Sequence, residues 1–379
     1  MFELTKEQEL LVKMVREYST NELEPRADDV DKESKIPQET YKEMGKIGLL
    51  GLNAPVEYGG AGMDDICKVL SIIEVTRACG STGEFFAVQL LVNYIIATHG
   101  TEEQKKKYLA MNAEGKIGAF ALTEPEAGSD AGGLQMTADK DGDDYIINGS
   151  KVFISNMGPD EGAYAIIFAL TDKTKGSHGG ITAFLVDRGT PGFTLGKLED
   201  KMGIRGAAVS ELIFEDCRLP KKQVLGKVGK GMHVAFSGLD SGRVGIAAQS
   251  IGYGQAALDA AIEYSKQRVQ FKKPISANQG LQWYLAEMAT RLEAAKLLAL
   301  KAAATMSKGQ SATMEASMAK YFAAETANWI AAKAVQIHGG YGFMKDYVVE
   351  RIYRDVRIVT IYEGSSEVQK IVISRALLQ

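Results

Sequence analysis

Glu363 is a carboxylate whose setting in this sequence raises the question of acid–base chemistry. It lies between Tyr362 and Gly364 in the segment IYEGSSE, just before a final amphipathic helix. A carboxylate in this position could be a solvated turn residue, a negative charge at a helix N-terminus, or a base that faces a pocket. The segment alone leaves these three roles open.

Two further segments could hold a flat ring or a phosphate. In LTEPEAGSD (122–130), Thr123 and Ser129 flank a turn whose hydroxyls and backbone N–H groups could bind such a group. In KVFISN (151–156), strand alternation places Phe153 and Ser155 on one face, where they could stack on a ring and hydrogen-bond to it. Taken singly, each segment more often forms a polar loop or part of the core.

Three C-terminal segments could contact a charged ligand. RVQFKKP (268–274) offers Arg268 to a phosphate, and VQIHGGYGF (335–343) contains glycines that let the backbone approach a ligand or cap a helix. LDSGR (239–243) contains Asp240 and Arg243, which also fit an exposed intrahelical ion pair. For the first two segments, a helix end followed by a turn is the commoner role.

Composition and motif spacing argue against several classes of protein. A net charge of −4 with dispersed basic residues gives no reason to expect nucleic-acid binding. The glycine-rich runs do not match the Rossmann or P-loop spacing. Three scattered cysteines and four histidines predict neither a disulfide framework nor a metal site.

The sequence also lacks the signals of membrane insertion or secretion. No apolar run approaches the roughly 20 residues that cross a bilayer, and MFELTKEQELL has no apolar signal core. We therefore expect a cytoplasmic protein without a membrane span.

The elements that must position these residues change type twice along the chain. Residues 1–116 show helical spacing, beginning with a capping box of Thr5 and Gln8. Residues 117–225 contain short runs rich in β-branched and aromatic residues, with Asn148-Gly149 as a predicted tight hairpin turn of an antiparallel β domain. Helical spacing returns over 226–379 and predicts a four-helix bundle. The fold class is therefore α+β with three domains at these boundaries.

In this order and at these spacings, the segments resemble the acyl-CoA dehydrogenase family. LTEPEAGSD, FISN, the Arg-x-x-Phe of RVQF, QIHGGYG and IYEGSSE correspond to family motifs, and the match covers essentially the whole chain. The chain is most similar to short-chain, butyryl-CoA dehydrogenase-like or enoyl-CoA reductase-like bacterial members.

The resemblance implies an FAD held between the β domain and the C-terminal bundle, with a neighbouring subunit completing the site in a homotetramer built as a dimer of dimers. It implies that Phe153 packs against the flavin and that Ser155 bonds near its N5 atom. The implied cofactor-binding residues are Phe120, Leu122, Thr123, Ser129, Phe153, Ile154, Ser155, Arg268, Phe271, Gln279, Gln336, Gly339, Gly340, Ser365 and Glu367. Arg268, Phe271, Gln279, Gln336 and Gly340 would reach an FAD held mainly by the partner subunit.

The resemblance also assigns Glu363 as the base that removes the α proton of a thioester while flavin N5 takes hydride from the β carbon. It implies substrate contacts from Ser129, Asp240, Arg243, Tyr362 and Gly364. Some relatives carry the base on the long helix, just before the arginine that matches Arg243. Gly242 stands there in this chain, so Glu363 is the single candidate.

The chain departs from the family pattern at a few positions. Lys272 replaces the usual glycine after the Phe of Arg-x-x-Phe, which puts the local backbone path in question and adds a cation near the expected FAD phosphates. Phe153 stands where many relatives have Trp, and Ser155 and Ser365 where many have Thr; these changes are conservative for stacking and hydrogen bonding.

The leading hypothesis is an FAD-dependent acyl-CoA dehydrogenase, or a 2-enoyl- or aryl-acryloyl-CoA reductase in the reverse direction, with an electron-transfer flavoprotein as partner. One alternative is an acyl-CoA oxidase or flavin monooxygenase, although oxidase-type relatives are typically longer. Another is a non-catalytic helical binding scaffold, which the presence of Glu363 and the flavin-loop residues disfavours.

Overall fold

The computed structural model describes residues 4–378, and its N-terminal part is helical as predicted. Its α-helices are α1 (Lys6–Tyr18), α2 (Ala27–Glu33), α3 (Gln38–Lys46), α4 (Asp65–Ala78), α5 (Gly80–His99) and α6 (Glu102–Tyr108). The capping box of Thr5 and Gln8 begins α1, which confirms that prediction. Helices α4 and α5 are separated at Cys79, where the backbone becomes extended.

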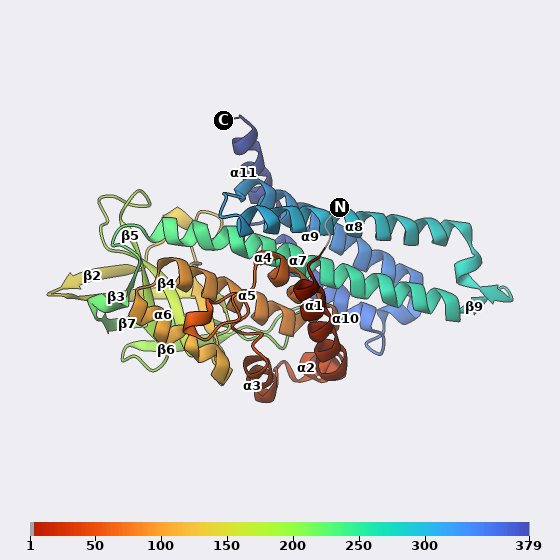
Figure 1. Cartoon of the computed structure of the whole chain (residues 1–379), viewed down its shortest axis with the longest axis horizontal. Helices are drawn as coiled ribbons and strands as arrows, with labels where there is room; N and C mark the ends of the chain where they lie inside the picture. Colours follow the sequence, from red (N-terminus) through yellow and green to blue (C-terminus); the bar gives the residue numbers. More distant parts are fainter. Residues whose placement is uncertain (1–3, 379) are drawn as a thin grey trace.

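The central part folds into one sheet at the left of Figure 1. Its strands are β1 (Gly118–Ala121), β2 (Thr137–Asp141), β3 (Asp144–Ser155), β4 (Tyr164–Leu170), β5 (Ile181–Asp187), β6 (Phe193–Leu198), β7 (Val209–Leu219) and β8 (Val224–Leu225). The order is β6-β7-β3-β2-β4-β5-β8, with β1 beside β4. Pairing is antiparallel as predicted, except that β1 runs parallel to β4 and β2 meets β4 in one parallel pair.

The hairpin turn predicted at Asn148-Gly149 is wrong, because strand β3 continues through both residues. The turn between β2 and β3 lies instead at 142–143. Asn148 accepts a hydrogen bond from the backbone N–H of Asp216, and the β3–β7 register shifts between Ile147 and Gly149. A Cβ atom at 149 would lie 3.0 Å from the Cα of Met136. The pair therefore forms a bulge, which also favours glycine and asparagine.

The C-terminal part contains α7 (Gly231–Gln267), α8 (Gln279–Ser307), α9 (Thr313–His338), α10 (Val348–Asp355) and α11 (Ser366–Leu378). The short strands β9 (Val269–Gln270) and β10 (Lys273–Pro274) lie at the end of the bundle that is remote from the sheet (Figure 1). The division into residues 1–116, 117–225 and 226–379 stays a prediction.

The three parts share their cores rather than folding side by side as separate units. One apolar cluster joins N-terminal helices to the bundle, with Ile72, Ile246 and Ile330 among its buried members. A second joins α5 to strands β4 and β5 and to the start of α7. Helix α5 belongs to both, which explains why nearly all of its residues are buried.

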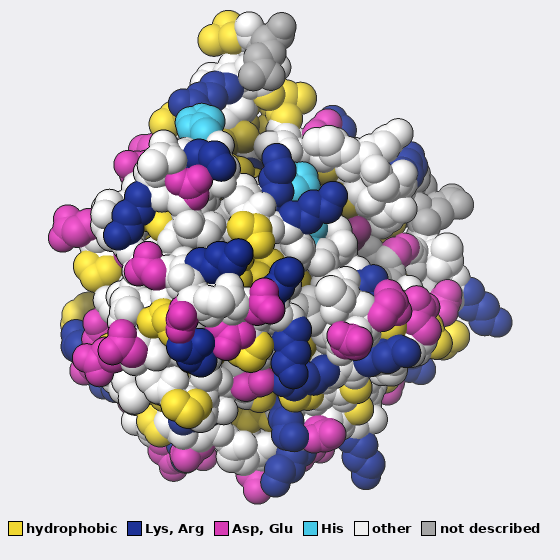
Figure 2. Space-filling model, turned by 90° about the vertical axis from the view of Figure 1, so that its left-hand side faces the viewer, with side chains coloured by type: hydrophobic (Ala, Val, Ile, Leu, Met, Phe, Trp, Pro, Cys, Tyr) yellow, Lys and Arg dark blue, Asp and Glu magenta, His cyan; other side chains and the backbone are white. Residues whose placement is uncertain are grey.

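Surface charge and hydropathy add two observations. Acidic and basic side chains are interspersed over the β-domain end of the molecule (Figure 2). Of the helices in residues 4–378, none combines the length and apolar character that a bilayer span requires.

Candidate active site

A strained turn presents Glu363. The turn follows the 3₁₀ segment Val356–Thr360 and precedes α11, and both Glu363 (φ 51°) and Gly364 (φ 90°) are left-handed. Gln369 donates from Nε2 to the carbonyls of Glu363 (3.2 Å) and Gly364 (2.8 Å), and Lys320 Nζ donates to the latter (2.7 Å). A left-handed backbone at a non-glycine residue costs about 1 kcal/mol or more of conformational free energy. The bonds from Gln369 and Lys320 hold the backbone in this conformation and so fix the direction of the Glu363 side chain.

The carboxyl group of Glu363 lies against Gly242 on α7. A Cβ atom at position 242 would lie 2.7 Å from the carboxyl carbon, closer than real Cβ contacts occur. Oxygen Oε2 is buried and has no hydrogen-bond partner among the described residues. Burial raises the pKa of Glu363 to about 7, while Lys68, Lys320 and nearby Arg243 oppose the rise.

Buried cations surround this carboxyl group. Lys68 on α4 is fully buried, and its Nζ donates to the carbonyl (2.9 Å) and to the hydroxyl of Ser241. Burial lowers the pKa of Lys68, and it lowers that of Lys320 to about 8. Both positive charges stabilise an ionised Glu363 and lower its pKa, but the loss of hydration on burial raises the pKa by more.

The ion pair of Asp240 and Arg243 is not the exposed pair that the sequence allowed. Arg243 is only 7% exposed; its Nη1 donates to Asp240 (2.7 Å), and its Nε is buried without a partner among the described residues. Asp240 also accepts from the hydroxyl of Thr313 at 2.5 Å. A buried guanidinium with a spare donor is suited to an anionic or carbonyl group.

A buried ion pair holds the loop that contains Leu122 and Thr123 against β3. Lys151 Nζ donates to the carbonyl of Leu122 (3.0 Å) and to Glu124 (2.7 Å). The backbone N–H of Val152 donates to the carbonyl of Thr123 (3.0 Å). Burial lowers the pKa of Lys151 to about 8, although Glu124 opposes this shift. The loop is thereby fixed at the start of the FISN segment.

The FISN segment exposes an aromatic ring at the end of β3. Phe153 is 66% exposed with φ 59°, whereas Ile154 is buried. A register shift lies between Lys151 and Ile154, so the regular alternation assumed from the sequence is interrupted by a bulge. Ser155 is half-buried and donates from Oγ to Glu84 Oε1 at 2.5 Å.

The remaining residues of the predicted flavin face lie on β1 and in the loop that follows it. Phe120 on β1 is half-buried and packs edge-to-face on Phe168 (centroids 5.3 Å apart), and Ser129 is exposed in the loop after Leu122 and Thr123. An exposed ring beside fixed hydroxyls fits a flat heterocycle such as a flavin.

A second cluster lies at the other end of the bundle. Arg268, Gly339 and Gly340 line a pocket of about 550 Å³ between the ends of α7 and α9, and the Arg268 guanidinium lies over the Tyr341 ring (5.3 Å). Gln279 is the first residue of α8, Gln336 lies in the last turn of α9, and both are exposed. The structure therefore separates the predicted cofactor residues into two groups, one around the end of β3 and the Glu363 turn and the other where α7 and α9 end near the β9–β10 hairpin.

Phe271 and Lys272 form the tip of the β9–β10 hairpin at that end. Phe271 is 94% exposed, and both residues are left-handed (φ 51° and 65°). Two consecutive left-handed residues form the tight turn that usually selects glycine. Lys272 thus adopts a left-handed conformation that a glycine would adopt without strain.

The other residues of the last segment cap and anchor α11. Ser365 Oγ accepts from the backbone N–H of Val368 (3.4 Å), and Glu367 is exposed in the first helical turn. Tyr362 donates from its hydroxyl to Gln249 on α7. These contacts fix the chain on both sides of Glu363.

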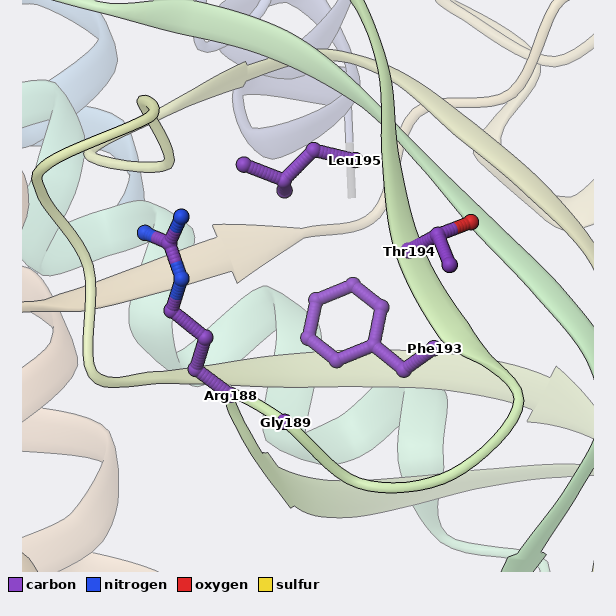
Figure 3. A pocket seen from close by; sticks show the side chains of 5 residues that line it. All are labelled: Arg188, Gly189, Phe193, Thr194 and Leu195. Atoms are coloured by element: carbon purple, nitrogen blue, oxygen red, sulfur yellow. The ribbon is translucent and has the colours of Figure 1, made fainter.

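Another pocket lies apart from both groups and contains none of the predicted residues. It is formed by Arg188, Gly189, Phe193, Thr194 and Leu195 near the β5–β6 connection (Figure 3). The Arg188 guanidinium already donates to the carbonyls of Gly158 and Pro159 (2.7 Å each). We therefore assign no chemistry to this pocket.

Sequence reasoning missed several charged residues that the fold places inside. The clearest are Glu84, Glu124, Lys68, Lys151 and Lys320, all of them buried. Their signal was a single charge within an apolar run, as in ICKVLSII and ASMAKYFAA. Such charges are almost never fully buried unless they are paired or functional.

Comparison with known proteins gives consistent matches along the chain. Family models described as the N-terminal, middle and C-terminal domains of acyl-CoA dehydrogenase match residues 5–116, 119–217 and 229–378. The chain is 46% identical to "Acryloyl-CoA reductase (NADH)" of Anaerotignum propionicum over 381 residues, which cover 100% of this chain and 96% of that protein. It is 47% identical to "Acyl-CoA dehydrogenase, short-chain specific" of Clostridium acetobutylicum, with 98% of each covered.

A solved structure matches equally well. It is described as "Electron transferring flavoprotein of Acidaminococcus fermentans: Towards a mechanism of flavin-based electron bifurcation", and one of its chains matches with a TM-score of 0.97 and 45% identity. The match covers 100% of both chains.

Proposed function

This chain belongs to the acyl-CoA dehydrogenase family, and on that premise we propose that it oxidises or reduces the Cα–Cβ bond of a CoA thioester with FAD as cofactor. The organic substrate is a saturated acyl-CoA in one direction and a 2-enoyl- or aryl-acryloyl-CoA in the other. An electron-transfer flavoprotein exchanges electrons with the enzyme, in keeping with the relative described as an electron-transferring flavoprotein.

The observation that carries the proposal is the desolvated carboxyl group of Glu363. An α C–H bond is a weak acid, so its base needs a high proton affinity and must work near neutral pH. Burial raises the pKa of Glu363 to about 7, and the buried Oε2 has no partner in residues 4–378. Glu363 is accordingly the α-proton base in the oxidative direction and the acid in the reductive direction.

Stabilisation of the developing enolate falls to groups that can donate to the thioester oxygen. The backbone N–H of Glu363 is one such donor, since no hydrogen bond within residues 4–378 occupies it. Because the strained turn is held by Gln369 and Lys320, this donor is positioned before the ligand arrives.

The residues present fit FAD at two places. At the β-domain edge, Phe153 offers its exposed ring for stacking, and Thr123, Ser129 and Ser155 offer hydroxyls, with Phe120, Leu122 and Ile154 supporting them. The bound FAD supplies the hydride acceptor or donor. At the bundle end, the residues that would reach the adenosine diphosphate part of an FAD held mainly by a neighbouring subunit are Arg268, Phe271, Gln279, Gln336 and Gly340, with Gly339 beside them.

The separation of these two clusters in one chain is compatible with an FAD site shared between subunits, as in the homotetramer that we propose. Ser365 and Glu367 directly follow the catalytic turn, and we assign them to cofactor binding. Asp240, Arg243 and Ser129 bind the CoA thioester, with Tyr362 and Gly364 beside its reacting end. The proposed location is the cytoplasm, where CoA thioesters and such a redox partner are present.

The test uses the wild-type enzyme and Glu363→Gln, with Glu293→Gln on the exposed face of α8, outside the proposed site, as the control. Wild type should bind FAD, lose its yellow colour anaerobically with its acyl-CoA, and exchange the α proton of the thioester with solvent. Glu363→Gln should retain FAD and CoA binding but lose α-proton exchange, and Glu293→Gln should retain exchange. A colourless protein that takes up no FAD refutes the function, and exchange retained in Glu363→Gln refutes the assigned base. Hydrogen peroxide formed at the rate of turnover would identify an oxidase instead.

A further inference from the structure

Glu84 is a buried carboxyl group that no sequence motif identified. It lies on α5, the helix shared by the two apolar cores, and is only 1% exposed. The flanking residues Gly83 and Phe85 are buried as well. A carboxyl group at such a position is costly unless it has a partner or a task.

The partner of Glu84 is a residue of the proposed flavin site. Ser155 Oγ lies 2.5 Å from Glu84 Oε1, whereas Glu84 Oε2 is buried without a hydrogen-bond partner among the described residues. Ser155 follows the exposed Phe153 by two positions at the end of β3. Glu84 is therefore hydrogen-bonded to the hydroxyl group that the proposed function assigns to the flavin.

Compensating charge near Glu84 is weak. Burial raises the pKa of Glu84 to about 7; the bond from Ser155 and the charge of Lys201 oppose this rise, and Glu161 adds to it. No ion pair within residues 4–378 joins Glu84 to a lysine or arginine, and burial lowers the pKa of Lys201 itself. The titratable groups that interact with Glu84 from the packed elements are Tyr41, Glu161, Lys201, Tyr253, Tyr362 and Glu363.

We propose that Glu84 is a positioning residue whose protonation sets the direction of the hydrogen bond made by Ser155, and hence what that hydroxyl offers to flavin N5. When Glu84 is protonated, its O–H donates to Ser155 Oγ, and the Ser155 hydrogen is free to donate to the lone pair of an oxidised N5. When Glu84 is ionised, Ser155 must donate to the carboxylate, and it presents only lone pairs to the cofactor.

The two forms of the pair therefore treat the oxidised cofactor differently, because oxidised N5 is an acceptor and reduced N5 carries a hydrogen. This inference rests on the proposed function, which places Ser155 beside N5. It assigns Glu84 no contact with substrate or cofactor; Glu84 acts through Ser155 alone.

The experiment follows the visible absorption spectrum of the oxidised FAD-loaded enzyme from about pH 5.5 to about pH 8.5, about 1.5 units on either side of the raised pKa. All variants carry Glu363→Gln, because Glu363 titrates in the same range. The parent should show a pH-dependent spectral shift. Glu84→Gln does not titrate, and its amide nitrogen can donate to Ser155 as the protonated carboxyl does. It should therefore lose that shift and match the acid form of the parent at every pH.

Two further measurements complete the test. Once Ser155→Ala is added to both, the Glu84→Gln variant and its parent should give the same spectrum, since the effect passes through the Ser155 hydroxyl. One protonated-carboxyl infrared component of the parent at low pH should be missing from Glu84→Gln, while the components of Asp355 and Glu161, whose pKa values burial also raises, should remain. An unchanged pH response in Glu84→Gln, or a Glu84→Gln effect that persists without Ser155, overturns the inference. Neither result affects the proposed function, which fails only if the wild type binds no FAD or does not react with an acyl-CoA.

Discussion

Replacing Glu363 with glutamine is expected to stabilise the fold above neutral pH while it removes the base. The reason is that the unfolded chain releases this proton near the ordinary value of 4.5, whereas the folded protein retains it until about pH 7. Between these values the folded state binds the extra proton, so stability falls as the pH rises and then levels above 7. Glutamine carries no proton to lose and escapes this penalty.

The magnitude follows from the size of the shift. A difference of 7 − 4.5, or 2.5 pKa units, at about 1.36 kcal/mol per unit, amounts to about 3 kcal/mol at pH 8 and to almost nothing at pH 4. With about 2.1 cal/mol/K of unfolding entropy per residue, a chain of this length converts 3 kcal/mol into a rise in Tm of about 4 °C. The effects of Lys68, Lys320 and Arg243 are already contained in the net shift.

The assay is thermal unfolding of Glu363→Gln and wild type at about pH 5 and about pH 8, the two sides of the expected transition. Glu367→Gln is the control, because its carboxylate is exposed at the N-terminus of α11 and its pKa is lowered by backbone and Ser365 hydrogen bonds. Its stabilising effect is present above the unfolded pKa, so Glu367→Gln should lower Tm at pH 8. A Glu363→Gln gain that is equal at both pH values, or a loss at pH 8, would refute the desolvation argument.

Two further substitutions test the supports of the site. Lys151→Met removes the cation that pairs with the buried carboxylate of Glu124, and it should lower the free energy of unfolding, measured by denaturant titration, by about 3–5 kcal/mol. The control Lys107→Met removes an exposed ion pair and should lower it by about 1 kcal/mol or less. Equal losses in the two variants would contradict the burial argument. Gly242→Ala introduces a methyl group into the space of the Glu363 carboxyl group and should suppress α-proton exchange with little change in Tm. The control Gly280→Ala has open space around the added methyl group and should leave exchange intact. Normal exchange in Gly242→Ala would show that the carboxyl group does not act from this position.

Local sequence patterns were sufficient to predict most helices and strands and to identify the side chains that could take part in chemistry. Helical spacing predicted α1 with its capping box, and runs of β-branched residues predicted β4, β5 and β7. The Asn148-Gly149 hairpin failed because the same dipeptide favours a bulge, and only pairing with β7 distinguishes the two outcomes. Resemblance of motifs, rather than any single motif, placed Glu363 among the candidates.

The proton affinity of Glu363 could not be read from its neighbours in sequence, since Tyr362 and Gly364 do not determine burial. It depends on α7 offering Gly242 and on Lys68 and Lys320 approaching from α4 and α9. Glu84 likewise reaches Ser155 across 71 residues of chain. By itself, the sequence determined which groups could donate, accept or stack; tertiary structure decided which of them lose water and meet, because desolvation and hydrogen bonding are properties of packed surfaces rather than of chain neighbours.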